Sequence, residues 1–335
     1  MQKESLQNQA QKVMVKIGFL DAKEIYSGKW YDGSLRNSIF SGVYEGKPAV
    51  LKMYDDPRVT DEPLQLKKFH ELFDSVKPSI ITAPELYRYE ITSPTSGWFV
   101  MEHLPEGKFF PSPMNATERT EFLNVYHAYR SVFPKTATRP LLLHERFRAD
   151  QFHLANISRW INIAGLQEAQ FALDGKPTLL NTPEFVELYT NAEKIIRQEF
   201  MQRPMIWCHG HFKAHEVYKT NNGRYYLLDF AHTHLYPEGY EFGFMVWADQ
   251  FTTLQSKTTM NGLEAEVRNW IAAFEPIATE LNIKNFSELA RASLIERLMG
   301  TITADVVGNV NMPYEERARR MTLLMPLCQQ LIDEY

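Results

Sequence analysis

Hydrophobic and polar positions alternate in the first third of the chain and follow a helical period in most of the remainder. Glycine-broken runs in residues 24–54, rich in valine and tyrosine, predict an antiparallel meander of short strands. Apolar positions in residues 60–76 recur at helical spacing. Residues 84–106 return to two strand-like runs around a Pro-Gly turn. Residues 20–104 therefore predict a small sheet with one helix.

The pattern beyond residue 106 is mainly helical. Thr182 suits an N-cap and Pro183 suits the first turn of the helix that follows. Helical periods cover residues 116–133, 182–201, 263–281 and 286–300, with a last segment that starts at Pro313. We therefore divide the chain into an N-terminal part, residues 1–104, and a helical part, residues 105–335.

The segment 207–234 holds five of the chain's ten histidines. Within it, the apolar runs 217–219 and 225–230 flank an Asn-Asn-Gly turn, which predicts a hairpin. Residues 209–216 then form a loop before this hairpin, and Asp229 follows its second strand. Because a carboxylate beside buried strand residues is costly unless a cation or donors meet it, a magnesium ion is a natural partner for Asp229.

Composition narrows the function without identifying it. The 335 residues are 44% hydrophobic and 23% charged, with a formal charge of -5, so we expect no nucleic-acid partner. Cys208 and Cys328 are too few for a disulfide scaffold and lie in apolar surroundings, which favours buried thiols. The polar N-terminus and the absence of a bilayer-length apolar run predict a cytoplasmic protein with no membrane partner.

Four short motifs occur in an informative order: VLKMY, WFVMEHL, HGHFKAHE and LLDF. This order resembles the aminoglycoside phosphotransferase group of the protein-kinase-like superfamily, which includes choline and fructosamine kinases, over residues 24–250. The resemblance implies an α+β bilobal fold, with a small antiparallel N-terminal lobe carrying one helix and a larger helical lobe. It also implies a kinase that uses ATP, or another nucleoside triphosphate, and Mg²⁺ to phosphorylate a hydroxyl of a small molecule.

The resemblance assigns the nucleotide phosphates to Lys52 in VLKMY. Its carboxylate partner is either Glu62 or Glu71 on the following helix, and the E-x-x-x-L pattern favours Glu62. The first strand turn, which a plain hairpin explains equally well, supplies backbone N–H groups to the phosphates. Its candidate residues are Gly33, Ser34, Asn37 and Ser38.

In WFVMEHL, Met101 matches the residue at the back of the family's adenine pocket. Glu102 and Leu104 match the hinge, whose main chain binds the adenine edge. An edge strand explains the same letters equally well.

The catalytic loop departs from the family's His-Gly-Asp-x-x-x-x-Asn pattern. Asp229 matches the metal-binding aspartate, but His211 stands where the base aspartate is expected and Glu216 where the metal asparagine is expected. Glutamate keeps an oxygen ligand for magnesium, and neutral imidazole accepts a proton near neutral pH. The resemblance thus implies His211 as base, with Glu216 and Asp229 as metal ligands.

Three further residues take roles from the same resemblance. Lys213 supplies positive charge to the transferred phosphoryl group, and His209 is structural near the metal aspartate. Glu241 lies in Tyr240-Glu241-Phe242-Gly243, where the family has the aspartate of a Tyr-Asp-Leu-Ala segment, and anchors the activation-segment region.

Two alternatives from other classes stay open. The altered loop is compatible with a pseudokinase that binds a nucleotide or a partner without chemistry. The histidines are compatible with a metal-dependent hydrolase, because imidazoles with one carboxylate form a zinc set. Its ligands would come from His209, His211, His215, His232 and His234 around Asp229. The acceptor and the oligomeric state cannot be inferred from the sequence.

Overall fold

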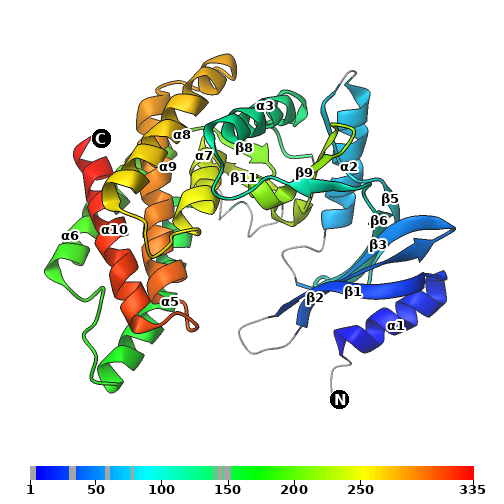
Figure 1. The fold of residues 1–335 in the computed structure, drawn as a ribbon, viewed down its shortest axis with the longest axis horizontal. Helices are drawn as coiled ribbons and strands as arrows, with labels where there is room; N and C mark the ends of the chain where they lie inside the picture. Colours follow the sequence, from blue (N-terminus) through cyan, green and yellow to red (C-terminus); the bar gives the residue numbers. More distant parts are fainter. Residues whose placement is uncertain are drawn as a thin grey trace. The chain divides into compact units, whose positions relative to one another are not determined.

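The computed structural model of the chain forms two compact units (Figure 1). The N-terminal unit comprises Met1–Phe109 and Glu216–Thr233, and the C-terminal unit comprises Phe110–His215 and His234–Tyr335. The structure describes residues 5–29, 35–56, 61–76, 79–138, 140–141, 146 and 152–335. Gly33 and Ser34, two of the candidate phosphate-loop residues, lie outside the described residues.

The hairpin that follows the histidine-rich loop belongs to the N-terminal unit. Its strands β9 (Val217–Thr220) and β10 (Tyr225–Leu227) pair with each other, and they also pair with β7 (Gly107–Phe109) and β4 (Ile81–Thr82), respectively. The hairpin itself was predicted from the sequence and is confirmed. The sequence-based division placed it with residues 105–335 because pairing with distant strands has no local signal; the boundary at residue 104 stays a prediction.

A five-stranded antiparallel sheet forms the main part of the N-terminal unit. The predicted meander is confirmed in its first three strands, where a tight turn joins β2 to β3 with positive φ at Glu45 and Gly46. The spatial order is β1 (Leu20–Lys29), β2 (Leu35–Tyr44), β3 (Lys47–Asp55), β6 (Ser96–Glu102) and β5 (Leu86–Ile91).

In the described part of this unit, α1 and α2 are α-helices, and only α2 was expected. Helix α1 (Leu6–Ile17) starts at the side-chain cap of Ser5, ends at Gly18 with φ 71°, and packs its apolar residues into a core with β3 and β6. Helix α2 (Glu62–Ser75) buries Phe69, whose ring stacks on that of Phe230 at 5.3 Å. That packing fixes the helix whose first turn carries Glu62.

The C-terminal unit is mainly helical, as predicted. Thr182 caps α6 through a hydrogen bond from Phe185 N, and Asn115 forms a capping box with Glu118 at the start of α3. Helices α8, α9 and α10 pack on one another (Figure 1, orange to red). The helices are α3 (Ala116–Val132), α5 (Phe152–Leu173), α6 (Pro183–Met201), α7 (Tyr240–Val246), α8 (Met260–Glu280), α9 (Phe286–Gly300) and α10 (Tyr314–Asp333).

Three features of this unit were not anticipated. Strands β8 (Met205–Cys208) and β11 (His234–Pro237) pair antiparallel on either side of the histidine-rich segment. Helix α5 was not expected, and two π-helical turns, Trp247–Phe251 and Thr301–Val307, continue α7 and α9. The α+β class is confirmed. Within the described part of the chain, no helix combines the length and apolar character needed to cross a bilayer.

Candidate functional site

Lys52 lies buried in the middle of β3, with 6% of its surface exposed. Its Nζ is 2.7 Å and 2.9 Å from the two carboxylate oxygens of Glu62. The sequence left Glu62 and Glu71 open as the carboxylate partner of Lys52. In the structure the partner is Glu62, whereas Glu71 lies exposed on the same helix. The role of this pair in nucleotide binding stays a prediction.

Asp229 is the second carboxylate at Lys52, with its Oδ1 3.3 Å from Nζ. It follows β10 in a left-handed conformation, φ 56° and ψ 67°, which aspartate tolerates better than most residues. The next residue, Phe230, is buried against Phe69 of α2. Packing on one side and the ion pair on the other thus hold Asp229 beside Lys52.

The charges of this cluster do not balance. Burial alone would lower the pKa of Lys52, but the carboxylates of Asp229 and Glu62 outweigh it and raise that pKa above its ordinary value. Burial raises the pKa of Glu62 while the ammonium lowers it. Because both oxygens of Glu62 lie within 2.9 Å of Nζ, we treat the pair as ionised. One ammonium then faces two carboxylates, which leaves an excess negative charge.

Glu216 is the other candidate metal ligand, and it belongs to the same unit as Asp229. Its backbone oxygen accepts a hydrogen bond of 2.9 Å from Leu228 N, the residue before Asp229. Two carboxylates and a local excess of negative charge suit Mg²⁺, which binds one or two protein carboxylates and takes its other ligands from phosphates and water. The types of side chain present suit a magnesium ion, and Asp229 and Glu216 as its ligands stay a prediction.

The structure gives the zinc alternative no support. Over the ranges that the structure describes, which contain all five histidines of residues 207–234, no three His, Cys, Asp or Glu side chains gather closely enough to hold a metal ion.

The remaining nucleotide candidates lie on the five-stranded sheet and its exit. Glu102 ends β6 and exchanges two hydrogen bonds with Glu85, through its N–H to the Glu85 oxygen and through its carboxylate from the Glu85 N–H. The Leu104 N–H makes no hydrogen bond with any described residue, so it is available to a ligand. Asn37 uses its side-chain oxygen to accept from Gly28 N, which holds β2 beside β1, and Ser38 is fully buried. Met101 lies on β6 and is partly buried.

The loop after β8 is anchored by buried polar groups of the C-terminal unit. His209 has no exposed surface, and its N–H donates to the hydroxyl of Tyr129 at 2.7 Å. Gly210 has φ 81°, and its N–H donates to Glu241 at 3.0 Å. Glu241, expected to be structural, thus holds the loop backbone directly.

His211 and Lys213 share one aromatic neighbour, Phe244 of α7. The imidazole stacks on the phenyl ring with centroids 4.3 Å apart and planes 15° from parallel. The Lys213 Nζ lies 6.0 Å from the same ring centre. Phe244 therefore fixes the orientation of the candidate base. Neither Phe244 nor Tyr129 was identified from the sequence, because an aromatic residue in a helical period signals only burial.

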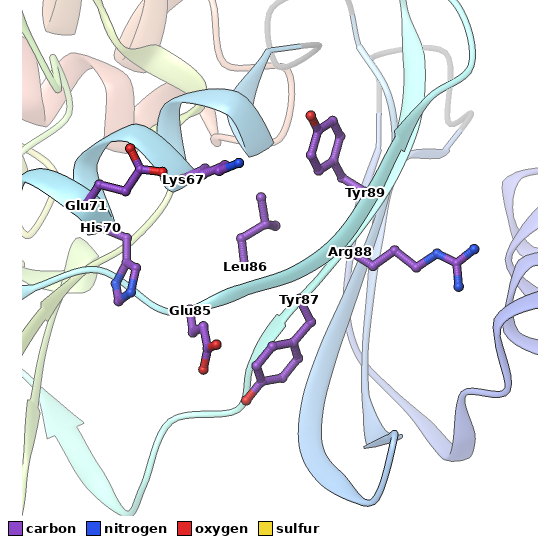
Figure 2. A pocket seen from close by; sticks show the side chains of 8 residues that line it. All are labelled: Lys67, His70, Glu71, Glu85, Leu86, Tyr87, Arg88 and Tyr89. Carbon is purple, nitrogen blue, oxygen red and sulfur yellow. The ribbon is translucent and has the colours of Figure 1, made fainter.

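A cavity of about 440 Å³ in the N-terminal unit is lined by residues of α2 and of the segment 85–89 (Figure 2). Figure 2 shows Lys67, His70 and Glu71 on α2 facing Leu86 and Tyr89 of β5. Both ring nitrogens of His70 are occupied, Nδ1 by the Ala83 oxygen and Nε2 by Asp74. The candidate residues Lys52, Glu62 and Asp229 do not line this cavity.

Solved structures with a similar fold include kinases and phosphotransferases. Aminoglycoside phosphotransferase APH(4)-Ia has a TM-score of 0.59 at 11% identity, with 98% of each chain covered. Plasmodium vivax ethanolamine kinase has a TM-score of 0.57 at 11% identity, covering 100% of this chain and 92% of its own. Choline kinase LicA from Streptococcus pneumoniae has a TM-score of 0.55 at 12% identity, covering 98% and 100%.

At these identities the likeness concerns the fold, which confirms the kinase-like architecture implied by the sequence. The chain matches none of the curated proteins with which it was compared. Residues 33–278, most of the chain, match the phosphotransferase enzyme family, and the protein belongs to that family.

Proposed function

We propose that the protein is a phosphotransferase that moves the γ-phosphoryl group of ATP to a hydroxyl of a small molecule. The observation that carries the proposal is the buried Lys52, held by Glu62 and Asp229 in a chain of the phosphotransferase enzyme family. The solved structures of APH(4)-Ia include complexes of thermostable mutants with ADP or AMP-PNP and hygromycin B, which supports the use of a nucleotide here.

In the proposed reaction, the acceptor oxygen attacks the γ-phosphorus while the bond from that phosphorus to the β,γ-bridging oxygen breaks. The acceptor proton passes to the imidazole of His211, and ADP leaves. Lys52 neutralises charge on the nucleotide phosphates, and Lys213 neutralises charge on the transferred group. Bound Mg²⁺ supplies further charge neutralisation, with Asp229 and Glu216 as its protein ligands. The N–H of Leu104 is the proposed donor to the adenine edge.

Two measurements on matched variants test the nucleotide site. Isothermal titration with ATP should show binding that depends on Mg²⁺ in the native protein and is lost in Asp229→Ala. Turnover, measured as ADP release, should fall by about 10²-fold or more in Lys52→Ala, the size of effect typical of a lost charge-stabilising group. Lys47→Ala is the control, because Lys47 lies exposed on the same strand. Equal turnover in the two lysine variants would refute the assignment of Lys52.

The acceptor is sought among the classes named for the similar structures. Hygromycin B and other aminoglycosides, choline and ethanolamine are the first compounds to test for stimulation of ADP release. Mass spectrometry of the product must show one added phosphoryl group, so that acceptor phosphorylation is distinguished from ATP hydrolysis.

A pseudokinase is the second candidate, and His211 in place of the family's aspartate is the observation that favours it. If His211 is a working base, His211→Asp should keep or raise phosphotransfer. Complete loss of turnover in that variant, with nucleotide binding intact, would count against His211 as a base. Nucleotide binding by the native protein without turnover on any acceptor would favour the pseudokinase.

A further inference from the structure

Beneath the loop that carries His211 lies a buried polar cluster made by α3 and α7. Its members are Tyr126, Tyr129 and Arg130 of α3 and Glu241 of α7, each with at most 6% of its surface exposed. A buried cluster of this kind is stable only when its donors and acceptors are matched. Here two of the matched donors are backbone N–H groups of the loop, so the cluster holds the loop.

The hydroxyl of Tyr129 is the centre of the cluster. It donates to Glu241 Oε1 at 3.1 Å and accepts from Arg130 Nη1 at 3.3 Å. It also accepts from the backbone N–H of His209 at 2.7 Å. One donor and two acceptor positions are all that a phenolic hydroxyl offers, so this group is fully used.

The carboxylate of Glu241 completes the hold on the loop. Its Oε1 accepts from the backbone N–H of Gly210 at 3.0 Å, and its Oε2 accepts from the hydroxyl of Tyr126 at 3.3 Å. Two consecutive backbone amides, those of His209 and Gly210, are therefore fixed immediately before His211.

The same helix also fixes the side chain of His211. Glu241 and Phe244 are three residues apart on α7, which places them on one side of that helix. Glu241 holds the backbone of the loop, and Phe244 stacks on the imidazole at 4.3 Å. Helix α7 therefore holds both the backbone just before His211 and the imidazole ring of His211.

We infer that Tyr129 is a positioning residue for phosphoryl transfer, whose hydroxyl sets the path of the His209–Gly210 backbone and thereby the place of the His211 imidazole. The inference rests on the proposed function. Tyr129 acts through the loop and touches no substrate. Its removal should therefore lower the rate of the chemical step without changing the affinity for nucleotide, whose candidate ligands lie in the N-terminal unit.

The chain offers a closely matched control in Tyr126. Both tyrosines lie on α3, both are buried, both donate to Glu241, and both rings contact that of Phe212 at 5.0–5.1 Å. Replacing either with phenylalanine removes one buried hydroxyl and keeps the ring. Tyr129→Phe alone leaves the buried His209 N–H without its acceptor.

Steady-state kinetics and hydrogen exchange of both variants test the inference. We expect kcat to fall about 10- to 100-fold in Tyr129→Phe, the scale of a small misplacement of a reacting group, and by less than about threefold in Tyr126→Phe. The dissociation constant for ATP should match the native value in both. Amides of residues 209–211 should exchange faster in Tyr129→Phe than in Tyr126→Phe, while peptides from α8 and α10 exchange as in the native protein.

Equal losses of kcat in the two variants, or unchanged exchange of the loop in Tyr129→Phe, would overturn the inference. The exchange measurement needs no turnover. If the native protein phosphorylates nothing, the proposed function fails, while faster exchange confined to the loop of Tyr129→Phe still supports Tyr129 as the residue that holds it.

Discussion

Replacing Glu62 with glutamine should destabilise the N-terminal unit, because the change removes one charge from a buried pair and keeps the size of the side chain. Both partners are almost inaccessible, with 3% of Glu62 and 6% of Lys52 exposed. Removing one member of a buried pair costs about 3–5 kcal/mol when the remaining charge has no other partner. Here Asp229 stays 3.3 Å from the ammonium, so we expect a loss of about 2–3 kcal/mol.

Hydrogen exchange in increasing urea measures this loss within the unit concerned. A chain with two compact units need not unfold in one step, and exchange of peptides from β3 and α2 reports the stability of the N-terminal unit alone. Glu71→Gln is the control, since it makes the same chemical change at an exposed position on the same helix. Its effect should stay within about 0.5 kcal/mol.

A loss in Glu62→Gln no larger than that in Glu71→Gln would refute the reasoning. It would mean that desolvation of the two charges cancels their attraction, so that packing alone places Lys52. A cycle with Lys52→Met separates the two effects, because an attraction that desolvation cancels still gives a clear coupling energy, whereas a coupling energy near zero means that the two charges do not attract each other.

The remaining predictions concern packing, pH and reactivity. Gly107→Ala should lower the free energy of unfolding by about 2 kcal/mol, because a Cβ there would lie 2.2 Å from a backbone oxygen of β9. Gly165→Ala, in open space on α5, should raise it by about 0.5–1 kcal/mol. Thermal unfolding of the two variants checks both predictions. Two arginines of α10 lower the pKa of Glu316 to about 2, below its unfolded value of 4.5, so Glu316 stabilises the fold above pH 4.5 and less as the pH falls towards 2. Glu316→Gln should cost about 0.5 kcal/mol at pH 7 and less at pH 3, as urea midpoints will show. Burial raises the thiol pKa of Cys208 and Cys328, so neither thiol should react with a disulfide reagent in the folded protein. After unfolding, the same reagent should detect two reactive thiols.

The parts of the fold that the sequence predicted are those with local signals. The hairpin at residues 217–227 follows from two apolar runs around Asn-Asn-Gly, and α6 follows from Thr182, Pro183 and a helical period. Helix α1 also had local signals, a serine cap and a C-terminal glycine, but its mostly polar surface concealed them. A short period with only three buried residues is too weak to stand out from a polar terminus.

The parts that the sequence did not predict depend on distant neighbours. Strands β8 and β11 are four residues each and pair Cys208 with His234, although the whole histidine-rich loop and the hairpin lie between them in the sequence. Strand β7 pairs with β9 because Gly107 has no side chain to collide with the facing backbone. Neither feature leaves a periodic pattern, since such short strands gain their stability from the sheet that they join.

The candidate site divides in the same way. Lys52 and Asp229 were found because the resemblance names a lysine in a strand and an aspartate after one, and the structure brings their side chains together. Tyr129 and Phe244 lay hidden in helical periods, where an aromatic residue indicates only a buried face. Tyr129 differs from the other buried aromatic residues of α3 because its hydroxyl accepts the His209 N–H, and only the structure shows that contact.

Glu241 departs from the family pattern, and its carboxylate is used by three buried donors. The resemblance expects an aspartate there, and glutamate carries one more methylene group. In this chain the longer side chain accepts hydrogen bonds from the hydroxyls of Tyr126 and Tyr129 as well as from Gly210 N. A shorter carboxylate at the same backbone position would draw back from at least one of these three buried donors, and an unpaired buried donor costs about 1–3 kcal/mol. Glu241 and Tyr129 therefore act together on the backbone of a loop that presents histidine instead of aspartate.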